Sequence, residues 1–172
     1  VKDDESDVLC DMLDEAVSDA VISLNEMRET EGLTVKADFE RLIDNIRVHL
    51  DMIKQRAPFV IDEYRVKLTK RIEEYLCSVE VDQAKLINEV AFFADKADIN
   101  EEISRLDSHI SQFADVIESD GEAGRKLDFL AQEMNREINT MGSKSADIEL
   151  LNHVVEMKNE LEKIREQIRN VE

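Results

Sequence analysis

The sequence predicts an all-α protein whose long amphipathic helices form antiparallel hairpins with coiled-coil-like seams. The 172 residues include four glycines and one proline, so few positions interrupt regular structure. Aromatic residues make up 5% of the chain and tryptophan is absent, so aliphatic side chains must form the core. Apolar residues recur at intervals of three and four along most of the chain, which is the spacing of a helix face.

The first half of the chain predicts three helical segments. Apolar residues from Val8 to Met27 have helical spacing, and Gly32 is expected to cap this helix. A second helix is expected from Val35 to Pro58, where we predict a break or kink, because proline lacks a backbone donor and disfavours helical geometry at Ala57. The third segment is expected to end near Ser78.

The second half predicts three further helices. Asp82 is expected to cap a helix of more than thirty residues that ends before Asp120-Gly121, with Val81 and Leu86 packed as a hydrophobic staple. The next helix is expected from about residue 124 to Gly142, and the last from after Ser145 to Val171. The predicted regions are therefore residues 1–80 and a C-terminal helical domain of residues 81–172.

Cysteine usage and hydropathy exclude several classes of protein. Cys10 and Cys77 have neither the spacing of a zinc site nor that of a disulfide framework, so we expect a reducing, cytoplasmic setting. No run of 18 apolar residues is present, so we expect no membrane association. The chain begins with Val1, and we expect it to be part of a longer protein.

The net charge of −19 argues against a simple nucleic-acid binder, which normally carries a surplus of lysine and arginine. One stretch is locally basic, because residues 41–71 contain 8 basic and 4 acidic residues. Its side chains Arg65, Lys67, Lys70 and Arg71 are candidates for binding a polyanion. A solvated helix face explains them equally well.

The predicted helix of residues 124–142 carries an unusual polar stripe. Helical spacing places five polar residues on one face: Arg125, Asp128, Gln132, Arg136 and Asn139. Glu133 and Glu137 lie beside this face as a like-charged pair, at a cost of a few tenths of a kcal/mol. Either Arg136 or a bound cation is expected to neutralise them.

A second polar stripe precedes it, formed by Asp98, Glu102, Arg105 and His109. Two carboxylates and an imidazole suit a hard or borderline divalent ion such as Mg²⁺ or Mn²⁺. Arg105 in the middle of the stripe favours instead a row of salt bridges on a solvated surface. The other two histidines, His49 and His153, lack such an acidic neighbourhood and are interpreted as ordinary surface or seam residues.

Three sequence patterns are distinctive: DxxEExxRLxxH at residues 98–109, GRKLDFLxQExNRExNTxxSKS at residues 124–145, and the terminal ELEKIREQIRNVE. In their order and spacing they resemble the YicC/YloC family of bacterial endoribonucleases. The resemblance is strong over residues 86–172 and extends to the element MRETEG, which contains Arg28, Glu29 and Glu31. It implies a cytoplasmic, metal-dependent endoribonuclease that forms a ring-like hexamer and grips structured RNA. Residues 1–80 would then be the latter part of the family's N-terminal region.

The resemblance marks the motif positions, and we assign roles to them by their chemistry. The expected ligands of Mn²⁺ or Mg²⁺ are Asp98, Glu102, His109, Glu133 and Glu137. The expected catalytic residues are His109, Asp128, Glu133, Arg136 and Glu137. The expected RNA-binding residues are Arg65, Lys67, Lys70, Arg71, Arg105, Arg125, Lys126, Arg136, Asn139 and Lys144.

Three alternatives stay open at the level of sequence. Cleavage without metal would use His109 as a general base on the ribose 2′-hydroxyl. A non-catalytic helical scaffold, oligomerisation module or adaptor would use the same stripes as salt bridges between helices. An acidic mimic of nucleic acid follows from the net charge alone, but the basic stretch of residues 41–71 weakens it.

Overall fold

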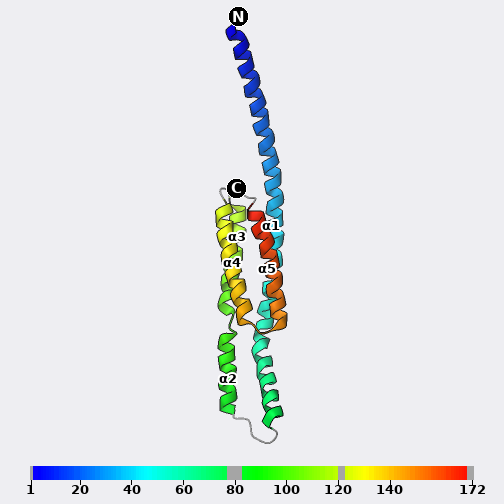
Figure 1. The fold of residues 1–172 in the computed structure, drawn as a ribbon, viewed down its shortest axis with the longest axis vertical. Helices are drawn as coiled ribbons and strands as arrows, with labels where there is room; N and C mark the ends of the chain where they lie inside the picture. The colour runs from blue at the N-terminus through cyan, green and yellow to red at the C-terminus, as the bar shows by residue number, and fades with distance from the viewer. Residues whose placement is uncertain (1, 77–82, 120–122, 170–172) are drawn as a thin grey trace. The chain divides into compact units, whose positions relative to one another are not determined.

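The computed structural model describes residues 2–76, 83–119 and 123–169, and for residues 2–9 and 75–76 it describes the backbone alone. Within these ranges the chain forms helices and no strands, so the predicted all-α class is confirmed (Figure 1). The helices are α1 (Lys2–Leu76), α2 (Gln83–Lys96), α3 (Asn100–Glu118), α4 (Gly124–Lys144) and α5 (Ile148–Ile168). In the described ranges, no helix combines the length and the hydrophobicity that a membrane span requires.

The chain divides into two compact units, residues 1–38 and residues 39–172. The first unit consists of the N-terminal part of α1, where side chains from residue 10 to residue 34 are exposed. Large apolar side chains are among them, including Met12, Val17, Leu24 and Met27. Arg28, Glu29 and Glu31 of the MRETEG element are exposed here as well.

Helix α1 continues through both residues that were expected to interrupt it, so the predicted end at Gly32 and the predicted break at Pro58 are wrong. A lone glycine costs about 1 kcal/mol in a helix, which its helix-forming neighbours outweigh. Proline costs about 3 kcal/mol, but Arg56 and Glu63 lie on either side of it and form two hydrogen bonds, of 2.6 and 2.8 Å. This bidentate pair joins the two turns that flank Pro58.

The predicted helix of more than thirty residues is also wrong, because it is divided into α2 and α3 at residues 97–99. The Asp98 carboxylate accepts hydrogen bonds from the Asn100 backbone N–H, at 3.0 Å, and from the Asn100 side chain, at 2.8 Å. Such local bonds offer the backbone an alternative to the helical pattern. Ile99 is buried at this junction, so burial of an apolar side chain accompanies the break.

The core of the second unit lies between α3, α4, α5 and the part of α1 that follows residue 38. Figure 1 shows α3, α4 and α5 side by side, and all four segments contribute fully buried aliphatic side chains. Examples are Ile46 from α1, Ile110 from α3, Ile138 from α4 and Ile164 from α5. Phe39 and Phe113 add an edge-to-face aromatic pair with ring centroids 5.7 Å apart.

The order of contacts gives the direction of each helix. Lys144 at the end of α4 contacts Glu102 near the start of α3, whereas Glu137 contacts Arg105, so α3 and α4 are antiparallel. Asn45 and Arg56 of α1 contact Glu160 and Asp147 of α5, so these two helices are antiparallel as well. Beyond this bundle, Tyr64 of α1 stacks on Phe93 of α2, with ring centroids 3.7 Å apart.

The last two helices begin close to where the sequence places them. Helix α4 starts at Gly124, and α5 follows Asp147, whose side chain accepts a hydrogen bond from the Leu150 backbone N–H. Six predictions fall outside the described residues. They are the end of the third segment near Ser78, the staple to Val81, the cap at Asp82, the region boundary between residues 80 and 81, the stop at Asp120-Gly121 and the end of the last helix at Val171.

Candidate functional site

His109 of the α3 stripe meets the two glutamates that flank the α4 stripe where α3 packs against α4. His109 of α3 and Glu133 and Glu137 of α4 each offer one ligand atom, and these three atoms lie within 4.8 Å of one another. Glu133 and Glu137 are one helical turn apart, so both point to the same side of α4. We call these three residues the His-Glu cluster. It brings together residues that the sequence places on separate helices.

Burial makes this cluster distinct from an ordinary charged surface. Glu137 is 3% exposed, whereas Glu133 and His109 are half-buried. The Nδ1 atom of His109 is buried and has no hydrogen-bond partner among the described residues. Because buried polar atoms are almost always hydrogen-bonded in folded proteins, this nitrogen has spare binding capacity.

Two arginines flank the carboxylates of the cluster. Arg105 of α3 lies with one guanidinium nitrogen 3.8 Å from Glu137 Oε1, and it also donates a hydrogen bond to Glu101. Arg136 of α4 lies 3.7 Å from Glu133 Oε2 and is largely exposed. These distances give ion pairs of long, loose geometry, which leave both guanidinium groups able to contact a second anion.

The chain matches a known family across this site. The family model described as "Endoribonuclease YicC-like, C-terminal" matches residues 53–172, which include all of α2 to α5. The chain belongs to the YicC-like family. A protein of Clostridioides difficile named "Probable endoribonuclease YicC" is 49% identical over 172 residues, which are 99% of this chain and 59% of that protein. A protein of Haemophilus influenzae with the same name is 33% identical over 157 residues, which are 91% of this chain and 54% of that protein. The chain therefore spans somewhat more than half the length of these relatives.

Two of the predicted metal ligands of this YicC-like chain lie in a separate polar group. Glu102 is 6% exposed, and its Oε1 accepts a hydrogen bond of 2.8 Å from Lys144 Nζ, which also donates to the Asp98 backbone carbonyl at 2.9 Å. The bond to Glu102 raises the pKa of Lys144, and this outweighs the opposing effect of desolvation. The Asp98 carboxylate is engaged by Asn100. The structure therefore brings His109, Glu133 and Glu137 together without Asp98 and Glu102.

The other predicted residues of α4 lie along its polar side. Asp128 accepts a hydrogen bond of 2.7 Å from Gln132, and Asn139 donates to Asn135 at 3.3 Å. Asp128 is thus engaged within its own helix and is not part of the His-Glu cluster. Arg125 and Lys126 are exposed in the first turn of α4.

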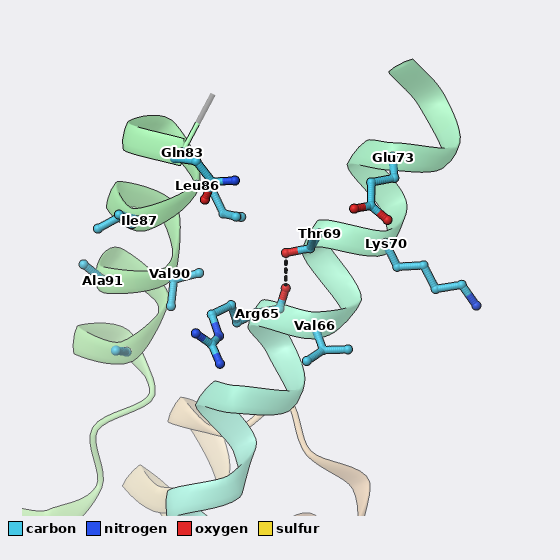
Figure 2. Close-up of a pocket in the computed structure, with 11 residues that line it drawn as sticks. Arg65, Val66, Thr69, Lys70, Glu73, Gln83, Leu86, Ile87, Val90 and Ala91 are labelled. Atoms are coloured by element: carbon cyan, nitrogen blue, oxygen red, sulfur yellow. Dashed lines mark hydrogen bonds between the residues drawn. The ribbon is translucent and has the colours of Figure 1, made fainter. Parts of the chain in front are cut away.

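The basic residues of the 41–71 stretch lie elsewhere. Arg65, Lys67, Lys70 and Arg71 are exposed on α1, and Arg65 and Lys70 line a groove of about 750 Å³ between α1 and α2. Figure 2 shows Arg65 directed into the space between the two helices, whereas Lys70 extends away from it. The rest of that groove is largely aliphatic, with Leu86 and Val90 facing α1. None of the cluster residues lines this groove.

Sequence reasoning missed two contacts between α1 and α5. The Nδ1 atoms of His49 and His153 are 3.0 Å apart, so these half-buried residues form a direct pair. Arg56 contacts Asp147 at 2.7 Å and Glu149 at 3.2 Å, and its hydrogen bonds lower the pKa of both Asp147 and Glu63. Helical spacing could not find these pairs, because their members lie on helices distant in the sequence.

Proposed function

We propose that this chain is part of an endoribonuclease that cleaves structured single-stranded or hairpin RNA with the help of a divalent metal ion. The observation that carries the proposal is the His-Glu cluster, together with the names of the relatives whose sequences match this chain. The candidate ion is Mn²⁺ or Mg²⁺. Assembly as a homo-oligomer, a hexamer in the intact family, and a cytoplasmic location are part of the same proposal.

The cluster fits a divalent ion in its chemistry. Two carboxylates supply the oxygen ligands that Mg²⁺ and Mn²⁺ prefer, and an imidazole is a good ligand for borderline ions. The ligand atoms lie within 4.8 Å of one another, and His109 has a nitrogen without a hydrogen-bond partner among the described residues. A bound ion would supply Lewis acidity toward a phosphodiester and would lower the pKa of a bound water.

The flanking residues of the chain bind and orient the RNA in this proposal. Arg105 and Arg136 lie beside the cluster, where their guanidinium groups can donate hydrogen bonds to phosphate oxygens. Fixed donors of this kind stabilise negative charge that develops during phosphodiester cleavage. Of the predicted RNA-binding residues, Lys144 is already engaged by Glu102, so its role is to position α3 against α4.

A second version of the reaction needs no metal. His109 would act as a general base and accept the proton of a ribose 2′-hydroxyl. The 2′-oxygen would then attack the adjacent phosphorus, and the 5′-oxygen of the next nucleotide would leave and take a proton from water. The products would carry a 2′,3′-cyclic phosphate and a 5′-hydroxyl. Cleavage that resists a chelator and leaves this end would rule out the metal-dependent version.

The competing function is that of a non-catalytic scaffold or adaptor. It is supported by two ion pairs, because Arg136 lies beside Glu133 and Arg105 lies beside Glu137. These arginines offset the charge of both carboxylates without a bound ligand. In that case the cluster stabilises the packing of α3 on α4 and does no chemistry.

Cleavage of a hairpin RNA by the intact protein in Mn²⁺ separates these two functions. We expect His109→Ala and Glu133→Gln to reduce the cleavage rate by at least about 100-fold, because each removes a group at the reacting centre. Glu156→Gln, which alters an exposed residue of α5, is the matched control and should retain the parent rate. Undiminished cleavage by folded His109→Ala and Glu133→Gln variants would remove the cluster from the mechanism.

A further inference from the structure

A second groove, of about 460 Å³, lies between α3 and α4 on the side of the α4 N-terminus. Its lining comes from both helices and includes Gln112, Asp115, Val116, Arg125, Lys126 and Phe129. None of these residues belongs to the His-Glu cluster. The groove combines an aromatic ring, two cations and two groups that can form hydrogen bonds.

Phe129 is the central feature of this groove. Its side chain is 59% exposed, although its neighbours Leu127 and Leu130 on α4 are buried in the core. An exposed aromatic ring does not contribute to the packing of the bundle. Its face is, however, a platform on which a nucleobase can stack, because every base has a π-face.

The positive charge beside Phe129 suits a phosphate group. Arg125 and Lys126 are exposed and form no ion pair with a described residue. They lie in the first turn of α4, which contains no acidic residue and has no side-chain cap from the described residues. Backbone N–H groups at such a helix start also favour an anion. Charge complementarity therefore points to a nucleotide and not to an apolar partner.

The groove also lies in register with the His-Glu cluster. His109, Gln112 and Val116 are spaced by three and four residues, so they share one face of α3. Phe129 and Glu133 are four residues apart on α4, which is slightly more than one turn, or about 6 Å, along the helix axis. A strand of RNA that follows the junction of α3 and α4 would therefore pass from Phe129 to the cluster.

We propose that this groove binds one unpaired nucleotide of RNA, with its base stacked on Phe129 and its phosphate held by Arg125 and Lys126. Gln112 and Asp115 line the same groove and offer hydrogen-bonding groups to the edge of the stacked base, and Gln112 Nε2 also donates to Ser108 Oγ at 3.0 Å. The inference rests on the proposed ribonuclease function. It adds a substrate class, because a base can stack on Phe129 only where it is not paired with another strand.

The test is the binding of a fluorescein-labelled hairpin RNA to the intact protein, followed by anisotropy in a chelator. The chelator prevents metal-dependent cleavage, and fluorine in place of each 2′-hydroxyl removes the nucleophile of the metal-free reaction. Binding is therefore measured without cleavage. We expect Phe129→Ala to weaken binding by about 5- to 150-fold, and Phe129→Trp to restore it to within about threefold of the parent. Phe59→Ala should bind as the parent does, because Phe59 is a phenylalanine of α1 with the same exposure of 59%.

Two further measurements identify the phosphate contact and exclude a contact between chains. Arg125→Gln combined with Lys126→Gln should make the plot of log binding constant against log salt concentration less steep. The expected change in slope is that for the loss of about one to two phosphate contacts. Sedimentation of Phe129→Ala should match that of the parent. A change in its oligomeric state would overturn the inference by assigning the groove to a contact between copies of the chain.

The inference and the proposed function fail in different ways. If the protein binds and cleaves hairpin RNA while Phe129→Ala binds as tightly as the parent, the stacking site is wrong and the ribonuclease function stands. If the parent protein does not bind the hairpin, both are wrong.

Discussion

His109 on α3 and Glu137 on α4 present ligand atoms within 4.8 Å of each other, although they belong to two different sequence motifs. The antiparallel packing of the two helices creates this proximity. It also places Arg105 beside Glu137 and Lys144 beside Glu102, so charges of both signs alternate along the junction. The cluster is therefore the point at which the α3 stripe and the glutamates beside the α4 stripe form one candidate site.

Binding of Mn²⁺ tests the cluster without any measurement of cleavage. We expect the intact protein to bind Mn²⁺ in a titration that follows the electron paramagnetic resonance signal of the free ion. His109→Ala, Glu133→Gln and Glu137→Gln should each weaken binding by at least about tenfold, because each removes one ligand. Glu156→Gln should not change it. Equal affinity in all five proteins would place the ion elsewhere.

Replacement of Lys144 by methionine should destabilise the second unit. Glu102 is buried, and its Oε2 atom already lacks a hydrogen-bond partner among the described residues, so loss of the bond from Lys144 leaves the whole carboxylate unsatisfied. We expect a loss of about 1–3 kcal/mol in the free energy of unfolding, measured in urea by circular dichroism. Lys158→Met on the exposed side of α5 is the control, with a change within about 0.5 kcal/mol. Adding Glu102→Gln to Lys144→Met should recover part of the loss.

The contact between Arg56 and Asp147 should make stability depend on pH in the acid range. The hydrogen bond from Arg56 lowers the pKa of Asp147 below its ordinary value of 3.8. The resulting stabilisation is fully present above pH 3.8 and is lost as the pH falls through the lower pKa of the folded state. Asp147→Asn keeps a helix cap but removes the charge, so we expect it to cost about 1–2 kcal/mol at pH 6 and progressively less below pH 3.8.

The comparison is made by urea unfolding at several pH values. Asp95→Asn is the control, because it removes one negative charge from an exposed residue of α2. Its free energy of unfolding should follow that of the parent at every pH. A difference between Asp147→Asn and the parent that stays constant from pH 6 to strong acid would contradict the assignment.

Two helical glycines should respond differently to alanine. A Cβ at Gly32 would meet no atom within 4 Å, so Gly32→Ala should stabilise helix α1 by about 0.5–1 kcal/mol. A Cβ at Gly142 would lie 3.1 Å from Val154 Cγ1, so the same gain is offset by strain between α4 and α5. We expect thermal unfolding to show a smaller gain or a loss for Gly142→Ala. Adding Val154→Ala should relieve that strain, and an equal gain at both glycines would show that the helices are less closely packed here.

Much of the fold was predictable from local pattern, and the errors have identifiable causes. The start of α4 at Gly124 and the start of α5 after Ser145 follow from turn residues beside strongly periodic segments. The predictions at Gly32, Pro58 and Asp98 failed because each depends on a balance of a few kcal/mol. The helix-forming neighbours of Gly32 outweigh its cost, the ion pair between Arg56 and Glu63 joins the turns beside Pro58, and local hydrogen bonds to Asp98 accompany the break between α2 and α3.

The candidate site was predicted in part, for a similar reason. The sequence marked five metal ligands, but spacing along a helix does not reveal which neighbour on another helix claims each carboxylate. Lys144 engages Glu102 and Asn100 engages Asp98, so three of the five form the cluster. Phe129 was absent from the predicted site because an exposed aromatic ring has no periodic signal.

The sequence by itself determined that the chain is helical, which side chains are available for a core and which family it resembles, because periodicity, composition and motifs are local properties. Only the tertiary structure decided that His109 faces Glu133 and Glu137, that Arg56 holds α1 to α5 and that α1 runs unbroken through Pro58. The first two outcomes depend on contacts between residues far apart in the chain, where charge and burial are settled by packing and not by sequence neighbours. The third depends on the ion pair between Arg56 and Glu63 across Pro58, which hydrophobic periodicity does not reveal.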